Sequence, residues 1–219
     1  MDKLHNWEKW IGTDESGKGD YFGPLVVVGV YVDTDSSEKI KEHGIVDGKR
    51  IYINQIQDMA EWLLDHYDKN ISVIKYMTSE YNSIYKKLVK QKKNLNNMLA
   101  EMHIKVITEL STRTDIKNAI IDKFSYHDLI SPKLPGNNYN LKLVTGGERD
   151  IAVAAASVIA RYTFRKELTA LSDKYKFDLP PGANDVINAG KLFVETHGIE
   201  ELKNVAKLHF RTTEQILNQ

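Results

Sequence analysis

The sequence lacks cysteine, long apolar runs and any net charge. None of its 219 residues is a cysteine, which excludes disulfides and thiolate metal sites and suits a reducing compartment. The polar start MDKLHNW argues against a secretory signal, and no apolar run approaches the roughly 18 residues that would span a membrane. We therefore expect a cytoplasmic protein that does not associate with membranes.

The charges balance over the chain, with 30 basic and 30 acidic residues. This balance argues against a strong overall attraction to nucleic acid, although a local cluster can override the total. One such cluster comprises Lys86, Lys87, Lys90, Lys92 and Lys93, which form either a solvated helix face or a positive strip for a polyanion. The composition, 42% hydrophobic and 27% charged, is that of an ordinary globular protein.

Hydrophobic periodicity predicts an α/β fold. Short segments rich in apolar and β-branched residues predict strands over 10–14, 25–33, 71–77, 119–124 and 139–145. Longer periodic segments predict helices over 54–67, over 78–110 with one break near Lys92 or Asn94, over 151–168, and two or three more over 183–219. We read 34–48 as a polar connector. The order predicts one domain over 1–219, with a mixed central sheet in a core to about residue 180 and a helical extension over about 183–219.

Two adjacent carboxylates, Asp14 and Glu15, lie in the segment GTDESGKGDYFGP, which has four glycines within twelve residues. The glycines allow the backbone to turn so that both carboxylates serve one site. Oxygen ligands without cysteine favour Mg²⁺ or Mn²⁺, and a pair of such ions could activate water and stabilise the leaving oxygen in phosphodiester cleavage. The alternative is an ordinary turn aspartate beside a surface glutamate.

Further acids and a glycine-rich backbone accompany this pair. Asp122 closes the predicted strand AIID, where open α/β sheets tend to build sites. Glu148 and Asp150 precede the apolar helix at 151 and could either bind a metal or interact with the helix dipole. Gly17 and Gly19 leave backbone N–H groups accessible to a phosphate or sugar, and Lys18 could neutralise a phosphate.

These segments together resemble a known family. The motifs GTDESGKGDYFGPLVV, AIIDKF, VAAASVIARYTF, LPPGA and AKLHFRTT occur in that order and are similar to those of ribonuclease HIII, from about Ile11 to Thr213. The DYFGP extension separates this family from its sister, ribonuclease HII. The resemblance implies an RNase H-like fold and metal-dependent endonucleolytic cleavage of the RNA strand of an RNA–DNA hybrid, leaving 5′-phosphate and 3′-hydroxyl ends.

The resemblance also implies which residues act. Asp14, Glu15 and Asp122 match the metal-binding and catalytic acids, which together would hold two Mg²⁺ or Mn²⁺ ions. The segment TGGERD is one residue shorter than the family pattern, so we choose Glu148 as the fourth acid and keep Asp150 as the alternative. The substrate contacts expected from the motifs are Gly17, Lys18, Gly19 and Tyr21 near the acids, and Lys49, Lys207, His209 and Arg211 toward phosphates.

Two departures and two alternatives accompany this resemblance. Only about eleven residues precede the first motif, whereas family members carry an N-terminal substrate-binding domain, so we expect weaker hybrid binding or a separate binding partner. DGK at 47–49 replaces the family's DSK and lacks its hydroxyl. The alternatives are ribonuclease HII-like cleavage at single ribonucleotides in DNA and a non-catalytic hybrid-binding module. We expect a monomer.

Overall fold

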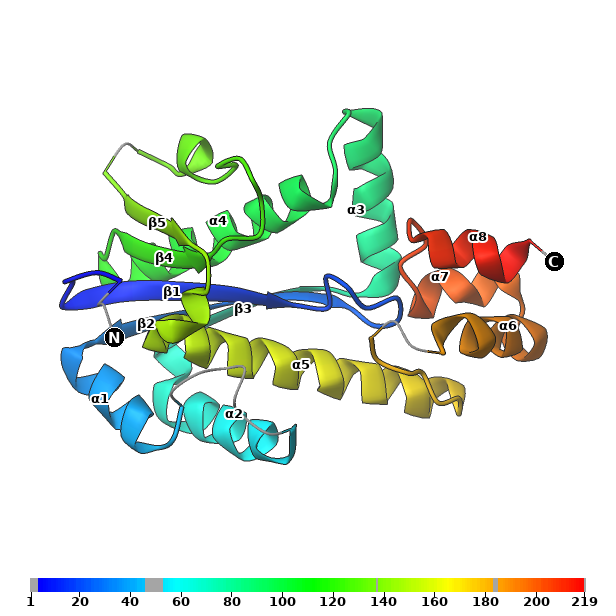
Figure 1. Ribbon diagram of the computed structural model, residues 1–219, viewed down its shortest axis with the longest axis horizontal. Helices are drawn as coiled ribbons and strands as arrows, with labels where there is room; N and C mark the ends of the chain where they lie inside the picture. Colours follow the sequence, from blue (N-terminus) through cyan, green and yellow to red (C-terminus); the bar gives the residue numbers. More distant parts are fainter. Residues whose placement is uncertain (1–3, 46–52, 137, 183–184, 219) are drawn as a thin grey trace. The chain divides into compact units, whose positions relative to one another are not determined.

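A five-stranded sheet forms the centre of the fold, with strand order β3-β2-β1-β4-β5 (Figure 1). The computed structural model describes residues 4–45, 53–136, 138–182 and 185–218. The strands are β1 (Lys9–Ser16), β2 (Leu25–Asp33), β3 (Ile71–Tyr76), β4 (Asn118–Asp122) and β5 (Asn140–Val144). All five predicted strands are confirmed, with ends shifted by at most two residues, and the sheet is mixed as expected.

Three strands at one side of the sheet run parallel. Ile11 of β1 pairs with Ala119 of β4, and Thr13 pairs with Ile121. Strand β4 in turn pairs in parallel with β5, up to Asp122 opposite Val144. Parallel strands bring their carboxyl ends to the same edge of a sheet. This edge therefore collects the residues that end β1 and β4.

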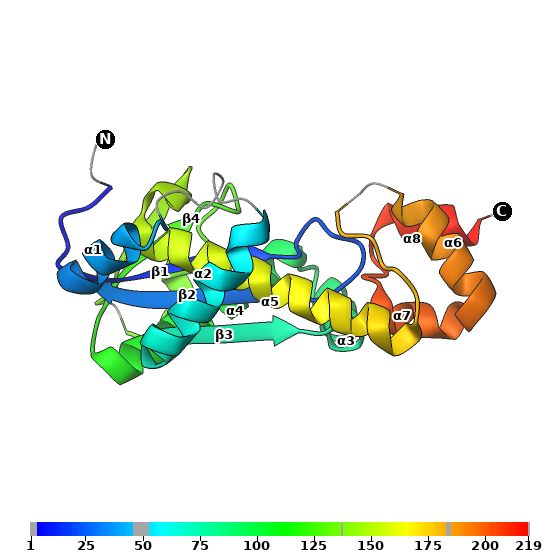
Figure 2. The ribbon, with the colours of Figure 1, turned by 90° about the horizontal axis from the view of Figure 1, so that it is seen from below.

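Helices cover both faces of the sheet (Figures 1 and 2). On one face lies α4 (Leu95–Thr114), so close to β2 that a Cβ at Gly29 would stand 2.9 Å from a methyl group of Leu110. On the other face lie α1 (Thr34–Glu42), α2 (Ile53–Tyr67) and α5 (Ile151–Tyr175). A Cβ at Gly12 would approach the backbone nitrogen of Val153 to 2.3 Å. Glycine is thus required for β1 to lie directly against α5.

The polar stretch after β2 is a helix, and our prediction of a connector there was wrong. Asp33 caps α1, because its carboxylate accepts a 2.8 Å bond from the Ser36 amide, while the Ser36 side chain bonds back to the Asp33 amide. Ile40 provides the buried apolar side chain that holds the helix to the sheet. The segment D-x-x-S differs from the usual capping-box pattern S/T-x-x-E/Q, so it gave no clear sequence signal. Only one buried apolar position follows it, so periodicity gave no signal.

The predicted break in the long helical segment is confirmed. Helix α3 (Thr78–Lys90) ends before Lys92, which adopts the left-handed φ of 57°, and α4 begins at Leu95. The helix predicted over 151–168 also exists, as α5, and continues to Tyr175. Within the described ranges, no helix is long and apolar enough to cross a membrane.

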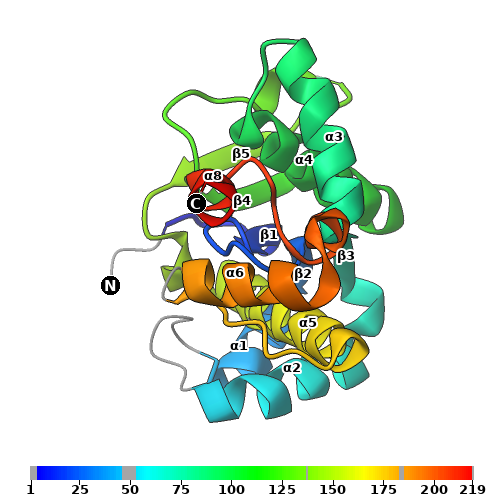
Figure 3. The same cartoon turned by 90° about the vertical axis from the view of Figure 1, so that its right-hand side faces the viewer.

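Residue contacts divide the chain into two compact units. The first, which we call the sheet unit, comprises residues 1–15, 27–74 and 99–162, and the second, the helical unit, comprises 16–26, 75–98 and 163–219. The helical unit contains α3, α6 (Val186–His197), α7 (Leu202–Val205) and α8 (Arg211–Leu217). Figures 1 and 2 show the last three side by side, and Figure 3 shows α6 and α8 on the side that faces the viewer. The 3₁₀ turns of the chain are Asp68–Asn70, Ser131–Lys133, Gly147–Arg149 and Ile199–Glu201.

Candidate active site

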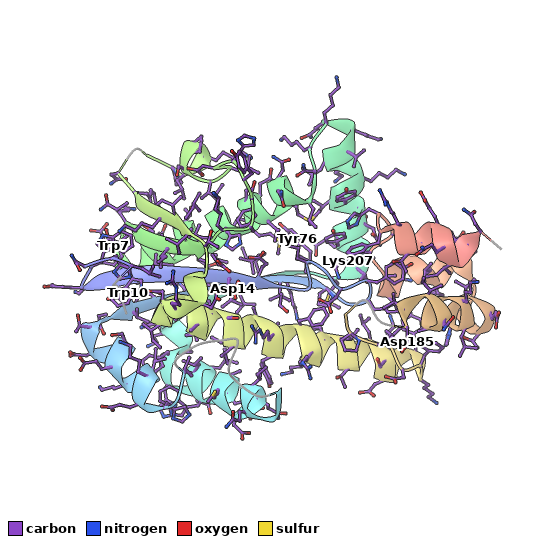
Figure 4. The ribbon with its side chains drawn as sticks, in the orientation of Figure 1. Trp7, Trp10, Asp14, Tyr76, Asp185 and Lys207 are labelled. Carbon is purple, nitrogen blue, oxygen red and sulfur yellow. The ribbon has the colours of Figure 1, made fainter. Side chains whose placement is uncertain are left out.

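The carboxyl ends of β1 and β4 bring three of the predicted acids together. Asp14 and Glu15 lie near the end of β1, and Asp122 is the last residue of β4. Because Thr13 pairs with Ile121, the next residues along the two strands, Asp14 and Asp122, are neighbours at the sheet edge. Figure 4 shows Asp14 on the blue β1 strand. The acids meet because strands distant in sequence are parallel, which no local motif specifies.

Asp14 lies in surroundings that disfavour its charge. Burial, the most important cause, and the negative charges of Glu15 and Asp122 raise its pKa to about 7. Two hydrogen bonds oppose the shift, from the Ser157 hydroxyl on α5 and from the Glu15 amide, which donates to Asp14 Oδ1 over 2.8 Å. A carboxylate held beside like charges is stabilised by a shared cation.

Glu148 follows a glycine that is pressed against Asp122. The Gly147 amide donates to Asp122 Oδ1 over 3.0 Å, and a Cβ at Gly147 would lie 2.9 Å from the Asp122 Cα. Only glycine allows this approach, so the 3₁₀ turn carrying Glu148 is fixed at the end of β4. One carboxylate oxygen of Glu148 is buried. The turn therefore places the predicted fourth acid next to the Asp122 backbone.

Asp150, the alternative fourth acid, uses both carboxylate oxygens in contacts with other parts of the protein. Its Oδ1 accepts from the amides of Ala152 and Val153, over 2.9 and 3.2 Å, and thereby caps α5. The same oxygen accepts from the Trp10 indole over 3.1 Å, and Oδ2 pairs with His5 over 2.9 Å. Asp150 is only 7% exposed. These contacts favour a structural role for Asp150.

His103, on α4, borders the acids and was missed in our sequence analysis. Its Nε2 lies 3.4 Å from Glu15 Oε2, and its Nδ1 lies 2.8 Å from the Thr13 hydroxyl oxygen. A histidine inside a long helical segment gives no local signal of function. Only the packing of α4 on the sheet brings this ring to β1.

The acids suit a hard divalent cation in their chemistry. In the described part of the chain, no three His, Asp or Glu side chains converge as a ready-made metal site. The candidate donors, Asp14, Glu15, Asp122 and Glu148, are nevertheless all carboxylates, the oxygen ligands that Mg²⁺ and Mn²⁺ prefer. Burial and then the charges of Glu15 and Asp122 raise the pKa of Asp14, and a bound cation would stabilise its charged form. We conclude that this donor set fits such an ion.

The glycine-rich segment after β1 belongs to the helical unit. Gly17 has a φ of +88°, and a Cβ there would stand 2.1 Å from the Pro24 carbonyl oxygen, so the turn requires glycine. Gly19 is exposed with open space at its Cβ position, and Lys18 is partly exposed. The backbone therefore has room for a ligand at Gly19, whereas Gly17 is buried. Lys49 lies outside the described residues.

The other predicted substrate contacts differ in exposure. Lys207 is fully buried, and its ammonium donates to the carbonyl of Asp20 over 2.7 Å. Tyr21 is 1% exposed, and its hydroxyl lies 3.1 Å from that of Thr213. Burial, together with the charge of Lys207, lowers the pKa of His209 to about 4, so its imidazole is neutral near pH 7. These placements argue against direct phosphate contacts by Lys207 and His209, whereas Arg211 is exposed.

Comparisons with known proteins identify the family of this chain. The family described as Ribonuclease HII matches residues 11–213. A Ribonuclease HIII of Protochlamydia amoebophila is 34% identical over 215 residues, which cover 95% of this chain and 68% of that protein. The chain thus spans about two thirds of that relative's length.

Solved structures share the fold. The crystal structure of Bst-RNase HIII in complex with Mn²⁺ has a TM-score of 0.84 and 30% identity, covering 95% of this chain and 69% of that one. The ribonuclease H2 of Pyrococcus horikoshii, at 21% identity and a TM-score of 0.79, covers 95% of this chain and 96% of its own, and shows the fold alone. The chain therefore belongs to the ribonuclease HII/HIII family and is an endoribonuclease that acts on the RNA of RNA–DNA hybrids.

Proposed function

We propose that Asp14, Glu15, Asp122 and Glu148 form the catalytic and metal-binding centre and that cleavage leaves 5′-phosphate and 3′-hydroxyl ends. The observation that carries this proposal is that the ends of β1 and β4 bring Asp14, Glu15 and Asp122 together, where burial and the two neighbouring carboxylates raise the pKa of Asp14 to about 7. Buried carboxylates that repel one another do not stabilise a fold. They are typical of functional sites. The complex of the structurally similar Bst-RNase HIII with Mn²⁺ supports the choice of metal.

The reaction is hydrolysis of one phosphodiester bond. A water oxygen joins phosphorus, and the bond to the 3′-oxygen breaks with a proton delivered to that oxygen. When bound, Mg²⁺ or Mn²⁺ would lower the pKa of water and stabilise charge on the attacking and leaving oxygens. The strand ends hold Asp14 and Asp122 together as ligands. Ser157 orients the Asp14 carboxylate, and the Gly147 amide orients that of Asp122.

Recognition of the RNA strand would use the backbone of the glycine-rich segment. An A-like hybrid presents its 2′-hydroxyls in a wide, shallow minor groove. Gly17 and Gly19 flank Lys18 in a turn that requires glycine at position 17, where a side chain would clash with the Pro24 carbonyl. We assign these three residues to the sugar-phosphate chain and the exposed Arg211 to a phosphate. The resemblance of the DYFGP segment to ribonuclease HIII favours a long hybrid as substrate over a single ribonucleotide in DNA.

Two finer expectations remain from the sequence. We expect the protein to act as a monomer, with a separate chain as a candidate for additional hybrid binding. Zero cysteines also support a reducing compartment such as the cytoplasm.

The experiment that tests the proposal compares two substrates. The purified protein is incubated with a labelled long RNA–DNA hybrid and with a DNA duplex carrying one ribonucleotide, each with Mg²⁺, Mn²⁺ or EDTA. We expect metal-dependent cutting of the long hybrid, with 3′-hydroxyl ends that a polymerase can extend. End analysis of the products distinguishes these ends from 3′-phosphates.

Each other outcome selects an alternative. Cutting at the lone ribonucleotide would favour the ribonuclease HII-like activity. Binding without cutting in any metal would identify a hybrid-binding module. Cutting that persists in EDTA would overturn the metal-dependent mechanism.

A further inference from the structure

His103 is a fully buried histidine whose two ring nitrogens both face β1. Its Nδ1 lies 2.8 Å from the Thr13 hydroxyl oxygen, and its Nε2 lies 3.4 Å from Glu15 Oε2. The ring also stacks in parallel on Phe124, with centroids 5.0 Å apart and 7° between the planes. The imidazole is 0% exposed. Helix α4 therefore holds it in one orientation beside the carboxylate pair.

The hydroxyl of Thr13 can select the position of the ring proton. If Nδ1 donated to Thr13, a neutral ring would turn an unprotonated Nε2 toward the Glu15 carboxylate, and two acceptors would face each other. If the hydroxyl donates to Nδ1, the proton lies on Nε2, the nitrogen that is 3.4 Å from Glu15 Oε2. Among the described residues, Nε2 is buried and makes no hydrogen bond, and its contact with Glu15 is a close approach of the two atoms without hydrogen-bond geometry. The carboxylate at 3.4 Å is therefore the acceptor that this distance offers.

We propose that His103 is a positioning residue, which holds one carboxylate oxygen of Glu15 through Nε2–H and so presets Glu15 as a metal ligand. The inference rests on the proposed function of Glu15. Asp14 and Glu15 repel each other, and a free glutamate side chain would reduce this repulsion by rotating away. The imidazole N–H opposes that rotation. Thr13 would affect Glu15 indirectly, because its hydroxyl fixes the tautomer of His103.

Three substitutions separate this role from ordinary packing. His103→Phe keeps an aromatic ring for Phe124 and removes both nitrogens, whereas His103→Gln keeps an N–H donor. Phe124→Leu is the matched control, since it removes the stacking and leaves Thr13, His103 and Glu15 unchanged. Mn²⁺ affinity is measured by calorimetry on the protein without substrate. Loss of an outer partner of a metal ligand weakens metal binding by about 10- to 100-fold.

We expect this loss in His103→Phe, partial recovery in His103→Gln and wild-type affinity in Phe124→Leu. The Mn²⁺ concentration for half-maximal cleavage should rise in parallel, more than kcat at saturating Mn²⁺ falls. Wild-type affinity in folded His103→Phe would overturn the inference. If the wild type itself binds no Mn²⁺, the proposed function fails first, and the two failures are thus distinguishable.

The position of the ring proton of His103 can be tested by spectroscopy on the wild-type protein. Long-range ¹H–¹⁵N spectra of the wild-type protein report which imidazole nitrogen carries a proton, and the His103 signals are assigned through their contacts with the Phe124 ring. A proton on Nε2 is the expected result. A proton only on Nδ1 would contradict the proposal. Thr13→Val, which removes the hydroxyl and keeps the shape, should shift the proton toward Nδ1 and weaken Mn²⁺ binding less than His103→Phe.

Discussion

Asp14 in the sheet unit and Lys207 in the helical unit are both ionisable groups that burial drives toward neutrality. Burial and neighbouring carboxylates raise the pKa of Asp14 to about 7. Burial lowers the pKa of Lys207 to about 7, although the charge of Asp20 opposes this. Similar pKa values therefore arise from opposite charges in different surroundings.

The neighbours of the two groups explain why their roles differ. Asp14 lies beside further carboxylates, so a bound cation would stabilise its charged form. Lys207 donates instead to backbone carbonyls of Asp20 and Phe22, and Phe22 forms a β-bridge with Ala206. These contacts hold the DYFGP segment to the segment that contains Lys207. A shifted pKa alone does not identify a catalytic group, whereas the charges around it do.

The largest effect is expected for Asp14→Asn, which removes a metal ligand without changing the size of the side chain. Turnover of a long hybrid with Mn²⁺ should fall by at least about a thousandfold, because several kcal/mol of charge stabilisation are lost. Single-turnover cleavage assays measure this loss. Asp58→Asn, an exposed acid on α2, is the matched control and should leave turnover unchanged.

The same variant should be more stable than the wild type in EDTA. The Asp14 carboxyl keeps its proton up to about pH 7 in the fold but ionises near pH 4 in the unfolded chain. The wild type therefore loses stability as the pH rises from about 4 to 7, and Asp14→Asn does not. The advantage of the variant at about pH 8 reaches up to about 4 kcal/mol in urea unfolding. More than a tenth of wild-type turnover, or unchanged stability, would contradict this account of Asp14.

Substitutions of the two candidates for the fourth acid, Glu148 and Asp150, should lower turnover less than Asp14→Asn, and they should distinguish the two candidates. Glu148→Gln should lower turnover by about 100-fold or more and leave the free energy of unfolding within about 1 kcal/mol of the wild type. Asp150→Asn should keep most of the turnover and lose about 1–3 kcal/mol of stability, because the negative charge at the α5 N-terminus disappears and the contact with His5 is weakened. The opposite pattern would make Asp150 the ligand. Urea unfolding and kcat at saturating Mn²⁺ measure the two effects.

The sequence predicted those parts of the fold that depend on local periodicity. Each strand is a short apolar segment, and the break before α4 lies at Lys92, where a lysine takes a left-handed conformation. Helix α1 was missed, since its stability comes from the Asp33 cap and the single buried Ile40. A pattern that requires several apolar positions on one face cannot detect such a helix.

The candidate site was only partly predictable for the same physical reason. Asp14, Glu15 and Asp122 stand at strand ends, and sequence motifs mark such ends. His103 lies within a helix, and its nearness to Glu15 depends on how α4 packs on β1. Lys207 showed the opposite error, because a lysine in a basic motif suggested an exposed phosphate contact, whereas the structure buries it. Motifs specify residue types, and burial is decided by packing between distant segments.

The smallest effect on turnover is expected for Lys207→Met. This variant also tests the contrast between Asp14 and Lys207. Between about pH 7 and pH 10.5 the unfolded chain holds the Lys207 proton and the folded chain does not, so the unfolding free energy of the wild type rises with pH. The methionine variant lacks this rise. The stability difference between the two should shift in favour of the wild type by up to about 3 kcal/mol between about pH 6 and pH 9.5. Lys203→Met, at an exposed position of α7, is the control and should follow the wild-type profile.

Turnover should fall by no more than about tenfold in Lys207→Met, a loss of about 1.4 kcal/mol. Backbone bonds from Gly23 to Val205 and from Lys207 to Tyr21 still hold the DYFGP segment when the ammonium is gone. A loss as large as that of Asp14→Asn would place Lys207 among the reacting groups and end the distinction between the two residues. Parallel pH profiles for Lys207→Met and the wild type would mean that Lys207 stays charged in the fold, and the contrast with Asp14 would then be wrong.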